Sequence, residues 1–161
     1  MGYRSNWKLA FTGKPVDLQK FMEWFEVKTK VRTTDSENNV LYEIFHESDK
    51  DIDIRNATII FSGERWKCYH PWDMVIDNLC TEQAENRFNL EYAYMRIGEA
   101  TDDIDTQSNG DLCIYSLTTI CDPDNFYVVH NDLLEELDEY LSSNVIQDCD
   151  RWSQIINERK T

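Results

Sequence analysis

Glycine is scarce in this 161-residue sequence, and the five glycines lie far apart along the chain: Gly2, Gly13, Gly63, Gly98 and Gly110. Loops that bind phosphate groups contain clustered glycines, because the backbone must approach the phosphate closely. The sequence therefore excludes the glycine-rich motifs of P-loop nucleotide-binding proteins and of Rossmann-type dinucleotide-binding proteins.

Closely spaced metal ligands are also missing from the sequence. The cysteines are widely separated and form no C-x-x-C motif: Cys68, Cys80, Cys113, Cys121 and Cys149. Cys68 and His70 are two residues apart on a predicted strand, but two ligands do not make a zinc site. We therefore expect reduced, mostly buried thiols, no bound metal and no cofactor.

Catalytic motifs and long apolar runs are lacking as well. No local pattern singles out a nucleophilic cysteine with a histidine, so we expect no catalytic residues and a protein that is not an enzyme. No apolar run approaches the length of a membrane span, and the first residues lack the apolar core of a signal peptide. These features predict a cytoplasmic protein.

Basic residues are missing from one third of the chain. Residues 97–150 contain 14 aspartates and glutamates and neither lysine nor arginine, so this stretch carries nearly all of the net charge of −15. Such a stretch repels nucleic acids and acidic membranes and attracts basic protein surfaces. An acidic surface also keeps a protein soluble, and this simpler explanation stands beside a role in binding.

Two groups of acidic residues in this stretch are candidate partner-binding residues. One group has the i, i+3, i+4 and i+7 spacing of a single helix face: Asp132, Glu135, Glu136 and Glu139. The other lies in or just before a predicted polar loop at residues 101–110: Glu99, Asp102, Asp103 and Asp105. We predict that both groups contact a protein with a basic surface, and that the chain binds neither nucleic acid nor a membrane.

Hydrophobic periodicity predicts the order of strands and helices. Alternation or short apolar runs predict strands at residues 7–12, 41–46, 57–61, 66–69, 90–97, 112–121 and 126–129. Helical spacing predicts helices from about Asp17, from Pro71, from Asn131 and from about Val145. The segments 57–61 and 66–69 are expected to form one hairpin, and residues 28–39 are expected to form a loop.

Two of these segments have clear faces. In the strand at 90–97, Tyr92, Tyr94 and Arg96 are predicted on one face, and Ala93, Met95 and Ile97 on the other. The helix that opens at Pro71 has an apolar stripe made of Trp72, Val75, Ile76, Leu79 and Cys80.

The order of elements predicts an α+β protein. We expect a ferredoxin-like β-α-β-β-α-β sandwich with an antiparallel sheet over residues 1–130, followed by a two-helix extension over residues 131–161. Apolar residues at 145–156 occupy more than one helical face, so the extension packs either on the core or on a second copy in a homodimer.

Two motifs resemble a family of small phage-encoded proteins. They are the opening residues Met1–Ser5 and the segment Tyr92–Glu99 followed by Asp102–Ile104. The length, the acidity and the helical C-terminal extension are also similar to the inhibitors of the host Lon protease that T-even bacteriophages encode. The resemblance implies a protein in the host bacterial cytosol that binds Lon and blocks its energy-dependent proteolysis, without catalytic residues or a cofactor.

An acidic DNA mimic is the alternative. Such a protein blocks a restriction or CRISPR-type nuclease by presenting carboxylates in rows like the phosphates of duplex DNA, which carries one charge per about 1.7 Å. The predicted helix face with Asp132 and Glu139 provides a short row of this kind.

Overall fold

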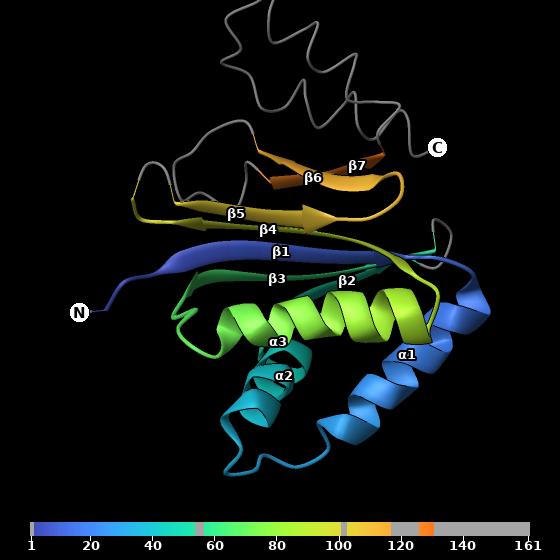
Figure 1. Ribbon diagram of the computed structural model, residues 1–161, viewed down its shortest axis with the longest axis horizontal. Helices are drawn as coiled ribbons and strands as arrows, with labels where there is room; N and C mark the ends of the chain where they lie inside the picture. Colours follow the sequence, from blue (N-terminus) through green and yellow to red (C-terminus); the bar gives the residue numbers. More distant parts are fainter. Residues whose placement is uncertain (1, 54–56, 101–102, 117–125, 131–161) are drawn as a thin grey trace, which may run out of the picture.

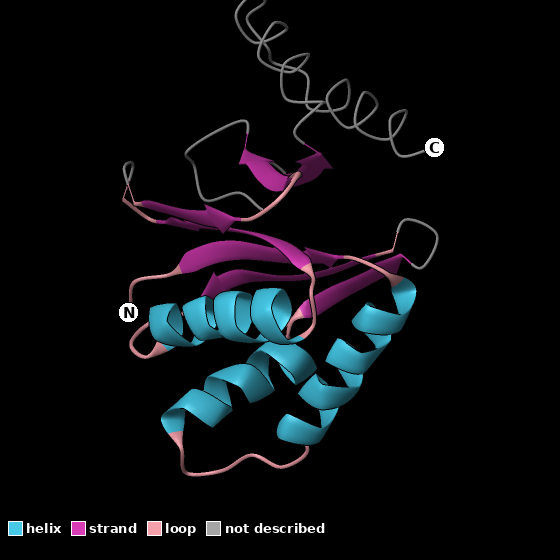
Figure 2. Cartoon of the chain, turned by 45° about the vertical axis from the view of Figure 1, so that its right-hand side comes forward, coloured by secondary structure: helices cyan, strands magenta, loops and turns pink. Residues whose placement is uncertain are grey.

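The computed structural model describes residues 2–53, 57–100, 103–116 and 126–130, and these residues form three layers (Figure 1). Helices cover one face of a five-stranded sheet, and a two-stranded hairpin lies over the opposite face (Figure 2). The fold is α+β, as the sequence predicts. Within the described residues, no helix is both long enough and apolar enough to cross a membrane.

The large sheet is antiparallel throughout. Its strands are β1 (Ser5–Thr12), β2 (Asp49–Asp53), β3 (Thr58–Trp66), β4 (Glu91–Gly98) and β5 (Ile104–Ser108). They lie in the order β2-β3-β1-β4-β5, so β1 occupies the centre and pairs with both β3 and β4. A central strand has neighbours on both edges and layers on both faces, and six of the eight residues of β1 are buried.

The helical layer has three helical segments. They are α1 (Pro15–Lys28), α2 (Ser36–Glu47) and α3 (Trp72–Asn78), and α3 continues directly into the π-helix η1 (Leu79–Arg87). The predicted stripe of the third helix is confirmed, because Trp72, Val75, Ile76, Leu79 and Cys80 are all buried.

The core between the helices and the sheet is rich in aromatic rings. Phe11 on β1 packs against Phe21 of α1 with ring centroids 4.7 Å apart, and Phe25 packs against Phe61 of β3 at 5.7 Å. All four rings are fully buried. Burial of one such side chain is worth about 1.5–3 kcal/mol, so this face of the sheet carries much of the stability of the fold.

The opposite face is covered by the hairpin of β6 (Leu112–Ser116) and β7 (Phe126–His130). Leu112 and Val128 of the hairpin are buried against Ala10 and Ala93 of the sheet. The predicted faces of β4 are confirmed, because the tyrosines of this strand lie in the helix-side core and Ala93 lies under the hairpin.

The predicted strand at residues 41–46 is wrong, because these residues lie inside α2. Asp35 caps this helix by accepting a hydrogen bond from the Glu37 backbone N–H at 3.1 Å. Val40, Leu41, Ile44 and Phe45 have helical spacing and pack against the core. Asp35 lies within residues 28–39, which were predicted to be a loop, so its role as the N-cap of a helix was not recognised.

The predicted hairpin at residues 57–69 is also wrong. The segment Ser62–Arg65 continues as one strand, β3, which pairs with β1 and β2. Between the pairs Trp7–Gly63 and Ser5–Trp66, β3 contains one residue more than β1, which is a β-bulge. Arg65 in the bulge has a φ of 58°. The turn-forming residues therefore make a bulge, not a reversal of the chain.

Two predicted boundaries differ from the structure, and other predicted segments lie outside the described residues. α1 begins at Pro15, with Lys14 at the N-cap, because proline favours the first helical position and Asp17 lies within the first turn. The predicted acidic loop at 101–110 contains β5. The segment 117–121 of the predicted long strand and the predicted C-terminal helices at 131–161, including the apolar residues at 145–156, lie outside the described residues.

Candidate functional site

The predicted acidic residues divide between described and undescribed parts of the chain. Glu99, Asp103 and Asp105 are described, and they lie at the turn between β4 and β5 or on β5 itself. Five predicted partner-binding residues lie outside the described residues: Asp102, Asp132, Glu135, Glu136 and Glu139.

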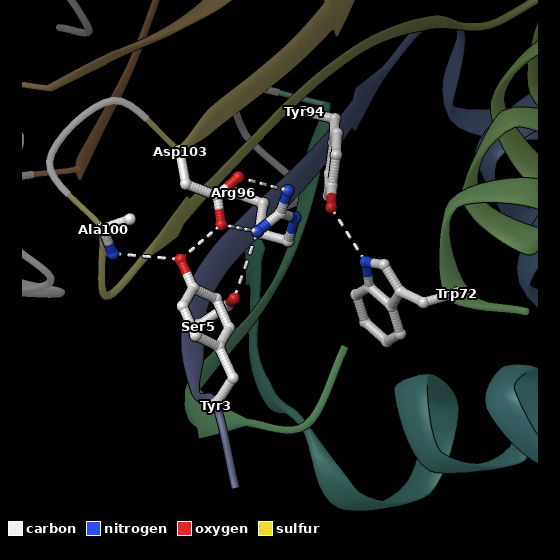
Figure 3. Close-up of polar contacts among 7 residues, drawn as sticks. All are labelled: Tyr3, Ser5, Trp72, Tyr94, Arg96, Ala100 and Asp103. Atoms are coloured by element: carbon white, nitrogen blue, oxygen red, sulfur yellow. Dashed lines mark hydrogen bonds and ion pairs between the residues drawn. The ribbon is translucent and has the colours of Figure 1, made fainter. Parts of the chain in front are cut away.

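Asp103 is the centre of a polar cluster that also contains Tyr3, Ser5, Arg96 and Ala100 (Figure 3). Arg96 donates two hydrogen bonds to the carboxylate, from Nη1 to Oδ2 at 3.1 Å and from Nη2 to Oδ1 at 3.0 Å. The Tyr3 hydroxyl donates a third at 2.5 Å. These bonds, Arg96 first and Tyr3 second, hold the pKa of Asp103 below its usual value, so the carboxylate is ionised and paired within the chain.

Arg96 owes its position to β4. It lies directly opposite Trp7 of β1, and its side chain is only 13% exposed. Nη1 also donates to the Ser5 hydroxyl at 3.2 Å, while Nε is buried and finds no acceptor among the residues that the structure describes. The hydrogen bonds with Asp103 are the main reason that the pKa of Arg96 is raised. The polar cluster thus closes one end of the helix-side core with a bidentate charge pair.

The same cluster holds the N-terminal segment against the β4–β5 turn. The Tyr3 hydroxyl accepts a hydrogen bond from the Ala100 backbone N–H at 3.0 Å, and its pKa is raised because it donates to Asp103. Glu99 accepts a hydrogen bond from the Arg4 backbone N–H at 2.8 Å. Gly98 leaves no room for a side chain, because a Cβ there would overlap both Asp103 and Tyr3. Glu99 and Asp103 therefore have structural roles that the sequence did not reveal.

A buried hydrogen bond continues this end of the core. Trp72 Nε1 donates to the Tyr94 hydroxyl at 2.9 Å (Figure 3), and burial raises the pKa of Tyr94. Tyr94 lies two residues before Arg96 on the same face of β4, so the hydrogen bond with Trp72 and the ion pair with Asp103 are neighbours on this strand. The arrangement fixes α3 to the sheet.

Asp105 differs from the other two described acids. It lies on β5 opposite Arg96, but no salt bridge within the described part of the chain includes it. Ile104, the preceding residue, is 41% exposed. The edge strand therefore presents an acidic side chain on one face of the sheet and an exposed apolar one on the other.

A groove lies between the helices α1, α2 and α3. It has a volume of about 240 Å³, and its lining includes Trp24, Leu41, Met74 and Arg87. The Arg87 guanidinium lies 5.7 Å from the centre of the Trp24 ring, which occupies both side chains in a cation–π contact. Pockets that bind small molecules usually measure about 300–1,000 Å³, so the groove is below that range.

Two side chains of kinds that act in catalysis, Cys80 and His46, are buried or hydrogen-bonded within the fold. Cys80 is fully buried, and burial raises its pKa, so the thiolate that acts as a nucleophile is disfavoured. His46 Nε2 is hydrogen-bonded to the Thr29 backbone carbonyl at 2.8 Å, and its ring packs on Tyr42. In the part of the chain that the structure describes, no three histidine, cysteine or acidic side chains gather as metal ligands would.

No protein-family model, curated protein or solved structure matches the chain.

Proposed function

We propose that this protein binds a protein with a basic surface, and that the partner is the Lon protease of a bacterial host, whose ATP-dependent proteolysis it blocks. The observation that carries the proposal is the charge distribution. Residues 97–150 carry 14 acidic side chains and neither lysine nor arginine, and Arg96, which directly precedes them, is paired internally with Asp103.

Electrostatic attraction favours this kind of partner. An acidic region without compensating lysine or arginine raises the rate of encounter with a basic surface and fixes its orientation, while apolar contacts supply much of the affinity. Asp105 and the exposed Ile104 are neighbours on the edge strand β5, where they offer an acidic contact on one face and an apolar contact on the other. The resemblance of Met1–Ser5 and Tyr92–Glu99 to small phage proteins supports a phage-type inhibitor acting in the host cytosol.

The proposal includes a ferredoxin-like β-α-β-β-α-β topology for the core of the fold. The first four strands lie in the order β2-β3-β1-β4, and every neighbouring pair is antiparallel. Helices connect β1 to β2 and β3 to β4 on one face of the sheet (Figure 1). This arrangement supports a split β-α-β core to which β5 and the β6–β7 hairpin have been added.

The test is an assay of purified Lon with ATP and fluorescently labelled casein. We expect casein degradation to fall as the full chain is added, and the inhibition to weaken as salt rises from about 50 to 500 mM, because the Debye length then shortens from about 14 to about 4 Å. Undiminished casein degradation at an excess of the chain contradicts the proposal.

The DNA-mimic alternative has its own observation in its favour, the acidic row Asp132, Glu135, Glu136 and Glu139 in the sequence. A mimic competes with duplex DNA for a nuclease and leaves Lon untouched. Inhibition of DNA cleavage by a restriction or CRISPR-type nuclease, relieved by added duplex DNA, would favour this alternative over Lon binding.

A further inference from the structure

The sheet has two edge strands, and they differ in how they are protected. β2 is Asp-Lys-Asp-Ile-Asp, so four of its five residues are charged, which discourages pairing with another chain. β5 is Ile-Asp-Thr-Gln-Ser and contains one charge, no lysine and no proline. Among the described strands, none pairs with the outer edge of β5. This edge therefore lacks the usual protection against strand addition.

Two backbone hydrogen bonds show which N–H and C=O groups of β5 point away from β4, toward the open edge of the sheet. Gly98 N–H donates to the Asp103 carbonyl at 2.9 Å, and Asn109 N–H donates to the Tyr92 carbonyl at 3.1 Å. These bonds bracket the β4–β5 ladder, in which bonded positions alternate along the strand.

The alternation assigns the backbone groups of β5. Asp105 and Gln107 share the parity of the bonded residues 103 and 109, so their N–H and C=O groups point toward β4. The N–H and C=O groups of Ile104, Thr106 and Ser108 therefore point away from the sheet. A strand that pairs with these groups would extend the sheet to six strands.

We propose that the outer edge of β5 binds an extended, lysine- or arginine-bearing segment of a partner protein by β-strand addition. The inference deepens the proposed function and rests on it, since it names the chemistry by which the partner is recognised. Main-chain hydrogen bonds to Ile104, Thr106 and Ser108 supply the contact, and charge sets the choice of partner.

Electrostatics favours a basic segment of a partner protein over a second copy of this chain at the outer edge of β5. From residue 97 to residue 150 the chain has no lysine or arginine, and Asp105 lies on β5 without a salt bridge among the described residues. A basic segment gains from this field, while a second copy of the chain adds another net charge of −15. A five-residue strand is also too short by itself to bury the roughly 1,200 Å² of a specific interface, so the copies have little to offset their repulsion.

The two faces of β5 predict the side-chain pattern of the segment. Asp105 lies on the Arg96 face of the sheet, whereas Ile104 and Thr106 lie on the face of Met95 and Ile97. Residues opposite Asp105 and Gln107 should therefore be basic or polar, and those opposite Ile104 and Thr106 should be apolar or β-branched. The segment has a period of two, with basic and apolar residues in alternation.

The decisive variant is Thr106→Pro. Proline removes one outward N–H and leaves the ladder with β4 intact, because the Thr106 N–H does not point toward β4. The probe is a seven-residue peptide in which lysine alternates with valine, titrated at low salt into the full chain. We expect the wild-type amide resonances of Ile104, Thr106 and Ser108 to shift, and Thr106→Pro to bind at least tenfold more weakly.

Three further variants separate the loss of the Thr106 N–H from other effects of the substitution. Thr106→Val keeps the N–H and should bind as the wild type does. Gln107→Pro removes an inward N–H and should lower the melting temperature clearly more than Thr106→Pro does, which tests the assignment of the backbone groups. Asp105→Asn should bind the peptide severalfold more weakly without a change in fold.

The outcomes separate this inference from the proposed function. If the wild type inhibits Lon and folded Thr106→Pro inhibits it equally well, the edge is not the docking site although the function stands. If the wild type does not inhibit Lon, the function fails, and the peptide titration still tests the edge. Equal peptide binding by wild type and Thr106→Pro overturns the inference, as does a dimer in sedimentation that Thr106→Pro abolishes, because a second copy then occupies the edge.

Discussion

The two faces of the central sheet are covered by different kinds of side chain, mostly large and aromatic on one face and smaller on the other. On the helix side, 17 described residues form one buried cluster, and aromatic rings from β1, β3, α1 and α3 make up much of it. On the hairpin side, the clusters of described side chains contain four and two buried residues, with alanines on both β1 and β4. Small residues allow β6 and β7 to approach the sheet closely, but they bury little area. We infer that the helix side carries most of the stability and that the hairpin side contributes less.

The largest expected effect tests that difference. Phe61→Ala removes a fully buried ring that contacts Phe11 and Phe25, and we expect it to lower the free energy of unfolding by about 3–5 kcal/mol. Met95→Ala on the hairpin side should cost about 2 kcal/mol, because the buried cluster of described residues around it is small. Urea unfolding of both variants measures the two losses. Equal losses would show that the two faces contribute alike.

A loss of stability of intermediate size is expected at the polar cluster around Asp103, which lies at one end of the helix-side core. Asp103→Asn removes the charge that pairs with Arg96, and we expect a loss of about 1–2 kcal/mol, since the carboxylate is partly exposed and solvent screens the pair. The matched control is Glu99→Gln, which keeps an acceptor for the Arg4 N–H and should change stability little. A loss from Glu99→Gln as large as that from Asp103→Asn would contradict a special role for the bidentate pair.

The same pair gives a pH dependence with a defined sign. Asp103 has a lowered pKa in the folded state and an ordinary value of about 3.9 in the unfolded chain. Its contribution to stability is therefore complete above about pH 4 and is lost as pH falls toward the lower folded pKa. We expect the difference in unfolding free energy between wild type and Asp103→Asn to shrink below pH 4. A constant difference from pH 7 to pH 3 would mean that ionisation of Asp103 is not the cause.

The smallest expected effect concerns the outermost helix. Asp35→Ala removes the N-cap of α2, and we expect a loss of about 1 kcal/mol. Lys14→Ala is the matched control, because Lys14 occupies the N-cap of α1 without a side-chain cap bond and its loss should be near zero. Thermal melting of the two variants compares them directly. A larger loss for Lys14→Ala would show that α1 depends on a contact at its first turn.

The sequence predicts the central strands well because their environment is simple. β1 and β4 each have a neighbour on both edges, and the alternation of Tyr92 and Tyr94 with Ala93 and Met95 follows directly from the two covered faces. The third helix is predicted for a similar reason, since one face packs on the sheet and one faces solvent.

The wrong secondary-structure predictions concern short segments whose residue pattern fits more than one kind of element. Leu41 and Ile44 fit a short strand or one turn and a half of helix, and the cap at Asp35 decides between them. Gly63 indicates a turn, yet the indole of Trp7 lies against it and the chain continues as a strand. β5 has a single large apolar residue, Ile104, so only its pairing with β4 makes it a strand.

The candidate site was predicted only in part. Charge counting selects Glu99, Asp103 and Asp105 as acids, but it cannot tell that Asp103 is paired with Tyr3, 100 residues earlier in the chain. One signal was available in the sequence: Arg96 is the last lysine or arginine before the acidic stretch, and it shares a predicted strand face with Tyr92 and Tyr94. A buried arginine needs a carboxylate partner, and the nearest acids follow in the adjacent turn.

The three packed tryptophans give the fold an optical signature. The Trp7 ring lies 5.1 Å from Trp66 and 5.2 Å from Trp72, and the latter two are 6.0 Å apart. Indoles at such distances, held at fixed angles, couple their transitions and should produce strong near-ultraviolet circular dichroism, a signal that disappears when fixed side-chain packing is lost. Because the rings come from β1, β3 and α3, this spectrum reports the junction of sheet and helix separately from the secondary structure.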